Sequence, residues 1–151
     1  MELPTSSNVR IAKHYAKLAR DYRKVNNDGQ TDITYEQTFN GERFTSYVID
    51  FHYTDEHHYD KVRTADTWDL RNGRQVQLKE LFKRKYGYKR QLVNALLDKM
   101  NVGENRRAVK RKLHKKIDEQ NFYLANDGLH IFTDSGRDFV VEYDVLNIKT
   151  A

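Results

Sequence analysis

Short segments of alternating apolar and polar residues, separated by turn signals, fill the chain between residues 31 and 78. Asn40-Gly41 and Asn72-Gly73 are dipeptides typical of two-residue hairpin turns. Between them, Tyr47, Ile49, Phe51 and Tyr53 recur at every second position, so we expect them to share one face of a strand. This part of the chain therefore predicts an antiparallel sheet built from hairpins.

Further strands are expected on either side of a polar hairpin tip at residues 54–58. The strand after the tip runs from Tyr59 to Leu70, and it places on one face Val62, Thr64, Asp66 and Trp68. Val76 and Leu78 are expected to resume the sheet. The C-terminal region predicts strands at 122–124, 129–132 and 139–143, with turns at Asn126-Asp127-Gly128 and Ser135-Gly136.

Helical periodicity occupies the two remaining regions. At the N-terminus, Ser7 or Asn8 could cap a helix whose apolar stripe is Ile11, Tyr15, Leu18, Tyr22 and Val25. In the middle, a turn of helix at 78–82 and helices at 88–100 and 105–117 predict a block of two to three helices. We therefore expect an α+β fold, in which an antiparallel sheet of hairpins packs against the N-terminal helix and this central block.

The length of 151 residues is typical of one domain that needs neither a metal nor a disulfide to fold. We expect a single domain over 1–151, with an N-terminal helix and turn at 1–30, the hairpin sheet at 31–78, the helical block at 79–117 and the last strands at 121–146. The chain has no cysteine, which excludes disulfides, thiolate zinc sites and cysteine nucleophiles. No stretch approaches the ~20 apolar residues of a membrane span, so we expect no membrane insertion by this segment.

Positive charge is concentrated in the helical block. From Lys83 to Lys116 there are thirteen Lys or Arg and two acidic residues, so this segment carries +11 while the whole chain carries +5. The remainder is therefore acidic, at −6. Such asymmetry predicts a basic face for an anionic partner, although charged helix faces are also often simply solvated. The residues expected to bind the anion are Lys83, Arg84, Arg106, Arg107, Lys110, Arg111 and Lys115.

The polar hairpin tip gathers residues that can bind a metal. His57 and His58 are flanked by Asp55, Glu56 and Asp60, and imidazole and carboxylate groups are zinc ligands. Adjacent residues of a strand point to opposite faces, however, so the two histidines make only a weak candidate site. We expect no metal here, and a metal-dependent enzyme built on this tip is the third of three functional alternatives.

No catalytic motif stands out in the sequence. His52, His130, Asp66 and Asp69 are available for acid–base chemistry, but their spacing selects no pair. The chain has no Ser-His-Asp signature, no phosphate-binding glycine loop and no HExxH motif. We therefore predict a domain without catalytic residues, cofactor or enzymatic activity of its own.

Three stretches, in this order, resemble a known domain. The first combines Tyr53-Thr54 and His57-His58 with Thr67-Trp68-Asp69-Leu70 and Asn72-Gly73; the second is Gln77-Leu78-Lys79-Glu80-Leu81-Phe82; the third is Asn121-Phe122-Tyr123-Leu124 with Asp127-Gly128-Leu129-His130-Ile131-Phe132. Together they are similar to the C-terminal extracytoplasmic domain of RsiV-type anti-sigma factors. The same domain of unknown function occurs beside the catalytic domain of some peptidoglycan and polysaccharide deacetylases of Gram-positive bacteria.

The resemblance covers the chain from about Thr34 to Leu146, with two departures. Asp55 and Glu56 stand where the family pattern has a pair of small residues before the tip histidine. The glycine-containing loop before the last strand is shortened to Asp134-Ser135-Gly136. The second departure matters if that loop contributes to the binding surface of the family.

The resemblance implies a non-catalytic binding or sensing domain, extracytoplasmic and held at the cell envelope by a segment outside this chain. In RsiV-type proteins this domain captures lysozyme, and in the deacetylases it is expected to position the enzyme on the wall; the parent protein could thus carry a separate deacetylase domain. The expected partner is a cell-wall anionic polymer met by the basic helices, or a secreted protein such as lysozyme met by an acidic face. That acidic face would comprise Asp50, Asp55, Glu56 and Asp60. The alternative function is a cytosolic nucleic-acid-binding module that uses the same basic helices, and in either case we expect a monomer.

Overall fold

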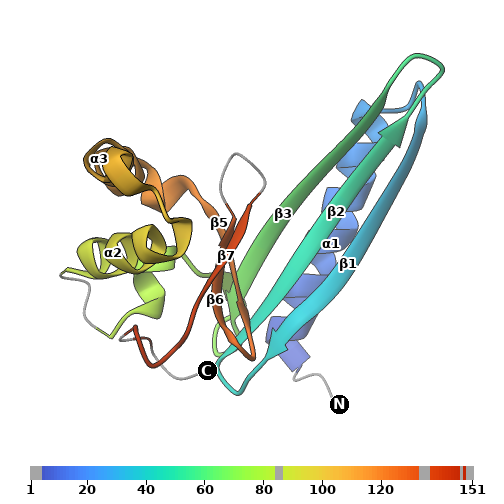
Figure 1. The fold of residues 1–151 in the computed structure, drawn as a ribbon. Coiled ribbons are helices and arrows are strands. Elements are labelled where there is room, and N and C mark those ends of the chain that lie inside the picture. The colour runs from blue at the N-terminus through green and yellow to red at the C-terminus, as the bar shows by residue number, and fades with distance from the viewer. Residues whose placement is uncertain (1–4, 84–86, 133–136, 147, 149–151) are drawn as a thin grey trace.

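The computed structural model describes residues 5–83, 87–132, 137–146 and 148. Its helices are α1 (Thr5–Val25), α2 (Tyr88–Met100) and α3 (Arg106–Lys116), joined by the short 3₁₀ helices η1 (Leu78–Leu81), η2 (Gly103–Asn105) and η3 (Ile117–Glu119). Its strands are β1 (Gln30–Asn40), β2 (Phe44–Thr54), β3 (Tyr59–Asp69), β4 (Arg74–Gln75), β5 (Asn121–Ala125), β6 (Gly128–Phe132) and β7 (Asp138–Val141). The predicted α+β class, with an N-terminal helix, antiparallel hairpins and a central helical block, is confirmed (Figure 1).

The strands form two antiparallel sheets. The long sheet has the order β1-β2-β3-β4, and the short sheet has the order β5-β6-β7. α1 lies along one face of the long sheet, while α2 and α3 lie beside the short sheet (Figure 1). The helical block is therefore separated from α1 by both sheets, because each set of helices covers a different one.

The smaller core lies between α1 and the long sheet. Ile11 and Tyr15 of α1 pack against Ile49 and Phe51 of β2 and against Trp68 of β3. The predicted alternation of β2 and the predicted helix stripe are both confirmed by this contact. The prediction was wrong for Val25, which is 79% exposed, because it is the last residue of α1 and lies outside the core cluster.

The larger core joins the short sheet to the helical block. Leu92, Val93, Leu96 and Leu97 form the buried face of α2, as the helical periodicity predicts. They pack with the inward residues of α3, η3 and the short sheet, which include Leu113, Ile117, Leu124, Leu129, Ile131, Phe139 and Val141. Leu78, Leu81 and Phe82 are buried in the same cluster, so η1 closes the space between sheets and helices.

The hydroxyl groups of Ser46 and Thr38 join the two sheets. Leu124 lies on β5, an edge strand of the short sheet, and its backbone N–H donates to Ser46 Oγ at 3.0 Å. The carbonyl of Leu124 accepts a bond from Thr38 Oγ1 at 2.8 Å, and Ser46 Oγ also lies 2.7 Å from Thr67 Oγ1. Side chains of the long sheet thus supply the hydrogen bonds that a further strand would otherwise give to Leu124.

Several predicted turns and boundaries differ in the structure. Residues 41–44 connect Asn40 to its partner Thr45, and neither Asn40 nor Gly41 has the positive φ that a two-residue type I′ turn requires. The second Asn-Gly turn is likewise longer than two residues, since residues 70–73 connect Asp69 to Arg74, with Gly73 at φ 67°.

The sheet does not resume through Leu78, which belongs to η1, because β4 ends at Gln75. Ser7 is not a helix cap, since it lies inside α1 and its hydroxyl donates to Leu70 O at 2.6 Å. The turn at Asn126-Asp127 is confirmed, and a Cβ on Gly128 would lie only 2.4 Å from Val141 O. The predicted turn at Ser135-Gly136 lies outside the described residues.

Candidate functional site

Four of the predicted anion-binding residues share one face of α3. Arg107, Lys110, Arg111 and Lys115 are spaced at three and four positions, which places them in a stripe along the helix, and all four are exposed. With His114 they border a shallow, open hollow of the surface. We call these four cations the α3 stripe. The opposite face of α3 is held in the larger core by Leu113, which is buried.

The charges of the α3 stripe repel one another. Arg107, Arg111 and Lys115 follow at intervals of four residues, and like charges at this spacing destabilise a helix by about 0.2–0.5 kcal/mol a pair. Arg107 also lies in the first turn, where the helix dipole disfavours a cation and where α3 has no acidic residue. None of the four forms an ion pair with any residue that the structure describes. A bound polyanion would relieve this repulsion.

The structure does not bring the other predicted cations to the α3 stripe. Arg106 donates to Asp98 at 3.2 Å, so its charge is partly neutralised. Lys83 is exposed just after η1, and α2 lies between η1 and α3 in Figure 1. Arg84 lies outside the described residues. The cations of the basic segment therefore do not form one continuous surface, and the α3 stripe is confined to one helix.

The four predicted acidic residues do not form one face. Asp50 and Asp60 lie on opposite faces of the long sheet, because Asp60 pairs with Tyr53 and Asp50 is three positions away from Tyr53 on the same strand. Asp50 is also bound by Arg63 through two hydrogen bonds of 2.8 and 2.9 Å, which together with the Arg63 charge lower the pKa of Asp50. Glu56 is exposed in the tip, where it is separate from Asp50.

Asp55 organises the hairpin tip rather than a metal site. Its carboxylate accepts bonds from the Tyr53 hydroxyl at 2.9 Å and from the His57 backbone N–H at 2.8 Å. His58 Nδ1 lies 3.7 Å from the same carboxylate. Across the part of the chain that the structure describes, no group of three or more His, Asp or Glu side chains is arranged to hold a metal ion.

A polar cluster on the short sheet was missed by the sequence analysis. His130 Nε2 lies 2.7 Å from Asp127 and its Nδ1 lies 3.1 Å from Asp138, while the Tyr123 ring stacks on the imidazole at 4.5 Å. Burial, and then the 2.5 Å hydrogen bond to Asp138, raise the pKa of Tyr123. The predicted turn at Asn126-Asp127 could have revealed the pairing of Tyr123 with His130, because it fixes the register of the β5–β6 hairpin. Both imidazole nitrogens are engaged within the cluster, which ties β7 to the β5–β6 hairpin.

A second missed network lies between α1 and the long sheet. The Tyr15 hydroxyl donates to Asp66 at 2.9 Å and accepts from Trp68 Nε1 at 2.9 Å. Desolvation raises the pKa of Asp66, although the bond from Tyr15 and the nearby His14 oppose this effect. Spacing within one element could not reveal this network, because Tyr15 is more than fifty positions from its partners.

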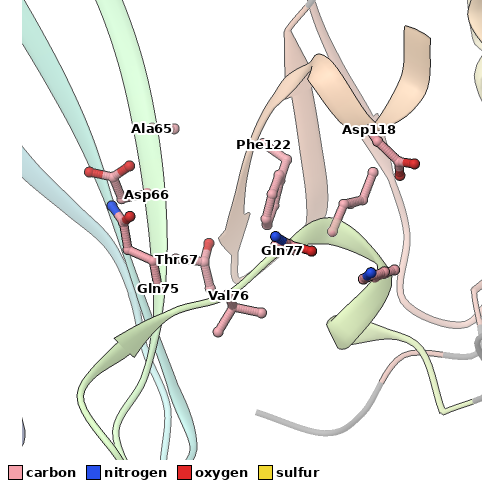
Figure 2. Close-up of a pocket in the computed structure, with 10 residues that line it drawn as sticks. Ala65, Asp66, Thr67, Gln75, Val76, Gln77, Asp118 and Phe122 are labelled. Atoms are coloured by element: carbon pink, nitrogen blue, oxygen red, sulfur yellow. The ribbon is translucent and has the colours of Figure 1, made fainter.

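A pocket of about 560 Å³ separates β3 from η1 and β5 (Figure 2). Its walls include Thr67 and Phe122, with Gln75 and Gln77 at the rim. Asp118 also lines it, but its carboxylate accepts a hydrogen bond from Tyr88 and pairs with Lys89 at 3.0 Å. The pocket therefore offers amide groups and an aromatic ring rather than an unengaged carboxylate at Asp118.

No helix in the described ranges is long and apolar enough to cross a membrane. No protein-family model matches the chain, and comparison with curated proteins finds no relative. Solved structures do show a similar fold. A DUF3298 family protein from Pseudomonas aeruginosa PAO1 has a TM-score of 0.53 and 9% identity, over 89% of this chain and 69% of that one.

A member of the DUF3298 family from Bacteroides fragilis NCTC 9343 has a TM-score of 0.52 and 18% identity, over 90% of this chain and 66% of that one. The chain thus spans about two thirds of the length of each neighbour. At these identities the likeness concerns the fold, and the resemblance to RsiV-type proteins stays a prediction. The chain has the fold of these two DUF3298 family proteins.

Proposed function

We propose that this chain is a non-catalytic, extracytoplasmic binding domain of a cell-envelope protein, and that it binds an anionic wall polymer through the α3 stripe. The observation that carries the proposal is the stripe itself. Its four cations share one helix face, and none has an ion-pair partner in the described ranges. Phosphate groups of a polymer such as teichoic acid would supply those partners.

A linear polymer suits the geometry of the stripe. The α-helix rises about 1.5 Å a residue, so charges four positions apart are displaced by about 6 Å along the axis. A flexible polyanion laid along α3 could therefore contact Arg107, Arg111 and Lys115 in turn. A folded basic protein such as lysozyme is less well supported, because the acidic residues do not form a continuous face and Asp50 is already bound by Arg63.

The location and the absence of catalysis are supported by other observations. The three stretches that resemble RsiV-type proteins support the envelope. The fold shared with DUF3298 family proteins is compatible with a binding domain. The sequence of the full-length gene offers an additional check of the proposed location, since an envelope protein is expected to carry a signal or transmembrane segment.

Co-sedimentation with purified cell walls tests the proposal. We expect the domain to pellet with walls that retain teichoic acid, to stay in solution with walls stripped of it, and to dissociate as salt rises. The variant Arg107→Glu/Arg111→Glu/Lys115→Glu should lose binding. The matched control is Lys13→Glu/Arg20→Glu/Lys24→Glu on α1, which makes the same charge change and also includes one position in the last turn of its helix.

Two outcomes would contradict the proposal. If both triple variants lose binding equally, net charge rather than the α3 stripe attracts the polymer. If the domain ignores walls but binds a double-stranded DNA or RNA fragment through Arg107, Arg111 and Lys115, the alternative of a nucleic-acid-binding module is the correct one. Circular dichroism of each variant separates lost binding from lost folding.

A further inference from the structure

A second group of cations lines a pocket formed by the turn before β2 and the loop between β3 and β4. Both segments lie at the end of the long sheet, away from α3 (Figure 1). The turn before β2 supplies Arg43, and the loop between β3 and β4 supplies Arg71 and Arg74. The pocket has a volume of about 280 Å³, which is room for a small molecule rather than a polymer. Its charge cluster is therefore distinct from the α3 stripe.

Asp69 in this pocket is already engaged by one arginine. Arg71 donates to both of its carboxylate oxygens, from Nε at 3.2 Å and Nη2 at 2.9 Å, and the Arg71 backbone N–H adds a bond of 2.9 Å. Burial alone would raise the pKa of Asp69, but these bonds and the charges of Arg71 and Arg43 lower it. Asp69 is thus hydrogen-bonded by Arg71, while Arg43 is near the same carboxylate without a hydrogen bond to it.

Arg43 has a buried donor that finds no acceptor. Its Nε is shielded from solvent and has no hydrogen-bond partner among the described residues. The closest carboxylate oxygen is Oδ2 of Asp69, at 3.8 Å, which is too long for a hydrogen bond. The guanidinium carbon lies 4.9 Å from the centre of the Phe44 ring, and this contact holds the group in place. No external oxygen fits beside the shielded Nε, so a ligand can reach only the two Nη groups of Arg43, which are not buried and have no hydrogen-bond partner among the described residues.

The remaining charges favour an anion. Arg74 is exposed at the rim, and within the described ranges its side chain has no hydrogen bond or ion pair. Glu80 also lines the pocket, but its Oε2 accepts the Gln77 backbone N–H at 2.7 Å. Three arginines against Asp69 and Glu80 leave the lining with one net positive charge.

We infer that this pocket binds a small oxyanion, a carboxylate or a phosphate group, between Arg43 and Arg74. The oxyanion accepts from the two Nη groups of Arg43, a planar fork that matches two oxygens of one such group. Arg74 supplies the second charge from the rim. Arg71 does not bind the oxyanion, because its Nε and Nη2 groups already donate to Asp69.

Isothermal titration of the purified domain with inorganic phosphate and, separately, with acetate tests the inference at fixed ionic strength. Saturable binding of either ion is expected, and the stronger of the two identifies the ligand class. Arg43→Gln should weaken binding by at least about tenfold, as expected for loss of a charge-assisted pair. Arg43→Lys keeps the charge but lacks the fork, so it should weaken binding similarly at an unchanged melting temperature.

The controls keep this pocket separate from the α3 stripe. Arg20→Gln on α1 and the triple glutamate variant of α3 should both bind the small ion as the wild type does. No heat with either ion would overturn the inference and would leave the Nη groups of Arg43 and the rim of the pocket to solvent. Undiminished binding by both Arg43→Gln and Arg43→Lys would also overturn it.

Discussion

The two cores of this domain are built from different kinds of side chain. The larger core, between the short sheet and the helical block, consists mainly of Leu, Ile and Val. The smaller core, between α1 and the long sheet, depends on the aromatic residues Tyr15, Phe51 and Trp68 and contains a hydrogen-bonded network. Aliphatic packing stabilises in proportion to the area buried, whereas the network stabilises only one register of helix on sheet.

A large-to-small change in the aliphatic core should have the largest effect. Leu96 is fully buried on α2, so Leu96→Ala removes apolar contacts and leaves a cavity. We expect it to lower the free energy of unfolding by about 3 kcal/mol, measured by chemical denaturation. Val62→Ala is a suitable control, because Val62 is 47% exposed and should lose far less. A loss below about 1 kcal/mol for Leu96→Ala would show that the core collapses around the change.

Removing the hydroxyl group of Tyr15 should destabilise the smaller core through lost hydrogen bonds rather than lost packing. Tyr15→Phe keeps the ring but leaves Trp68 Nε1 and Asp66 without their shared partner. We expect a loss of about 2 kcal/mol in the free energy of unfolding, because two semi-buried polar groups become unsatisfied. Tyr47→Phe is the control at an aromatic neighbour of Tyr15. Equal, small losses in both variants would mean that packing alone holds α1 to the sheet.

The pH dependence of the unfolding free energy should report the raised pKa of Asp66. Since burial raises its pKa in the folded state, the protonated form is favoured by folding. Its contribution to stability is therefore complete below the usual aspartate pKa of about 3.9 and is lost as pH rises through the raised value. The difference in unfolding free energy between the wild type and Asp66→Asn should decrease across that interval. A difference that increases with pH would mean that Asp66 is ionised and favoured by its hydrogen bond from Tyr15.

The smallest effect is expected at the exposed end of α1. Val25 belongs to neither core, so Val25→Ser should change the free energy of unfolding by no more than about 0.5 kcal/mol. Ile11→Ser, at a buried position of the same stripe, should cost several times more. The pair therefore measures where the contact of α1 with the long sheet ends.

The sequence predicted what depends on local periodicity. Alternation placed Ile49 and Phe51 on one face, and the helical spacing of Leu92, Leu96 and Leu97 placed them inward. It could not predict that the strands divide into two sheets, because hydrophobic alternation does not specify which sheet a strand joins. Ser46 and Thr38 read as ordinary polar residues of strands, and only the tertiary structure reveals their bonds to Leu124.

The candidate site was predictable to a similar degree. Composition located the basic segment and all seven cations, and the structure shows that Arg107, Lys110, Arg111 and Lys115 share one face of α3. The pairing of Arg106 with Asp98 depends on how α3 packs beside α2, which no local pattern encodes. The unsatisfied Nε of Arg43 could not be foreseen either, because its burial is a property of the folded loop.

The bonds of Ser46 and Thr38 to Leu124 also bear on how the protein behaves at high concentration. A sheet edge with unpaired backbone groups is a template on which another chain can assemble, and this is a common origin of aggregation. β5 is such an edge, and its donor and acceptor at Leu124 are both occupied by hydroxyl groups of the same molecule. Two small side chains thus protect the short sheet from recruiting a neighbouring copy at this position.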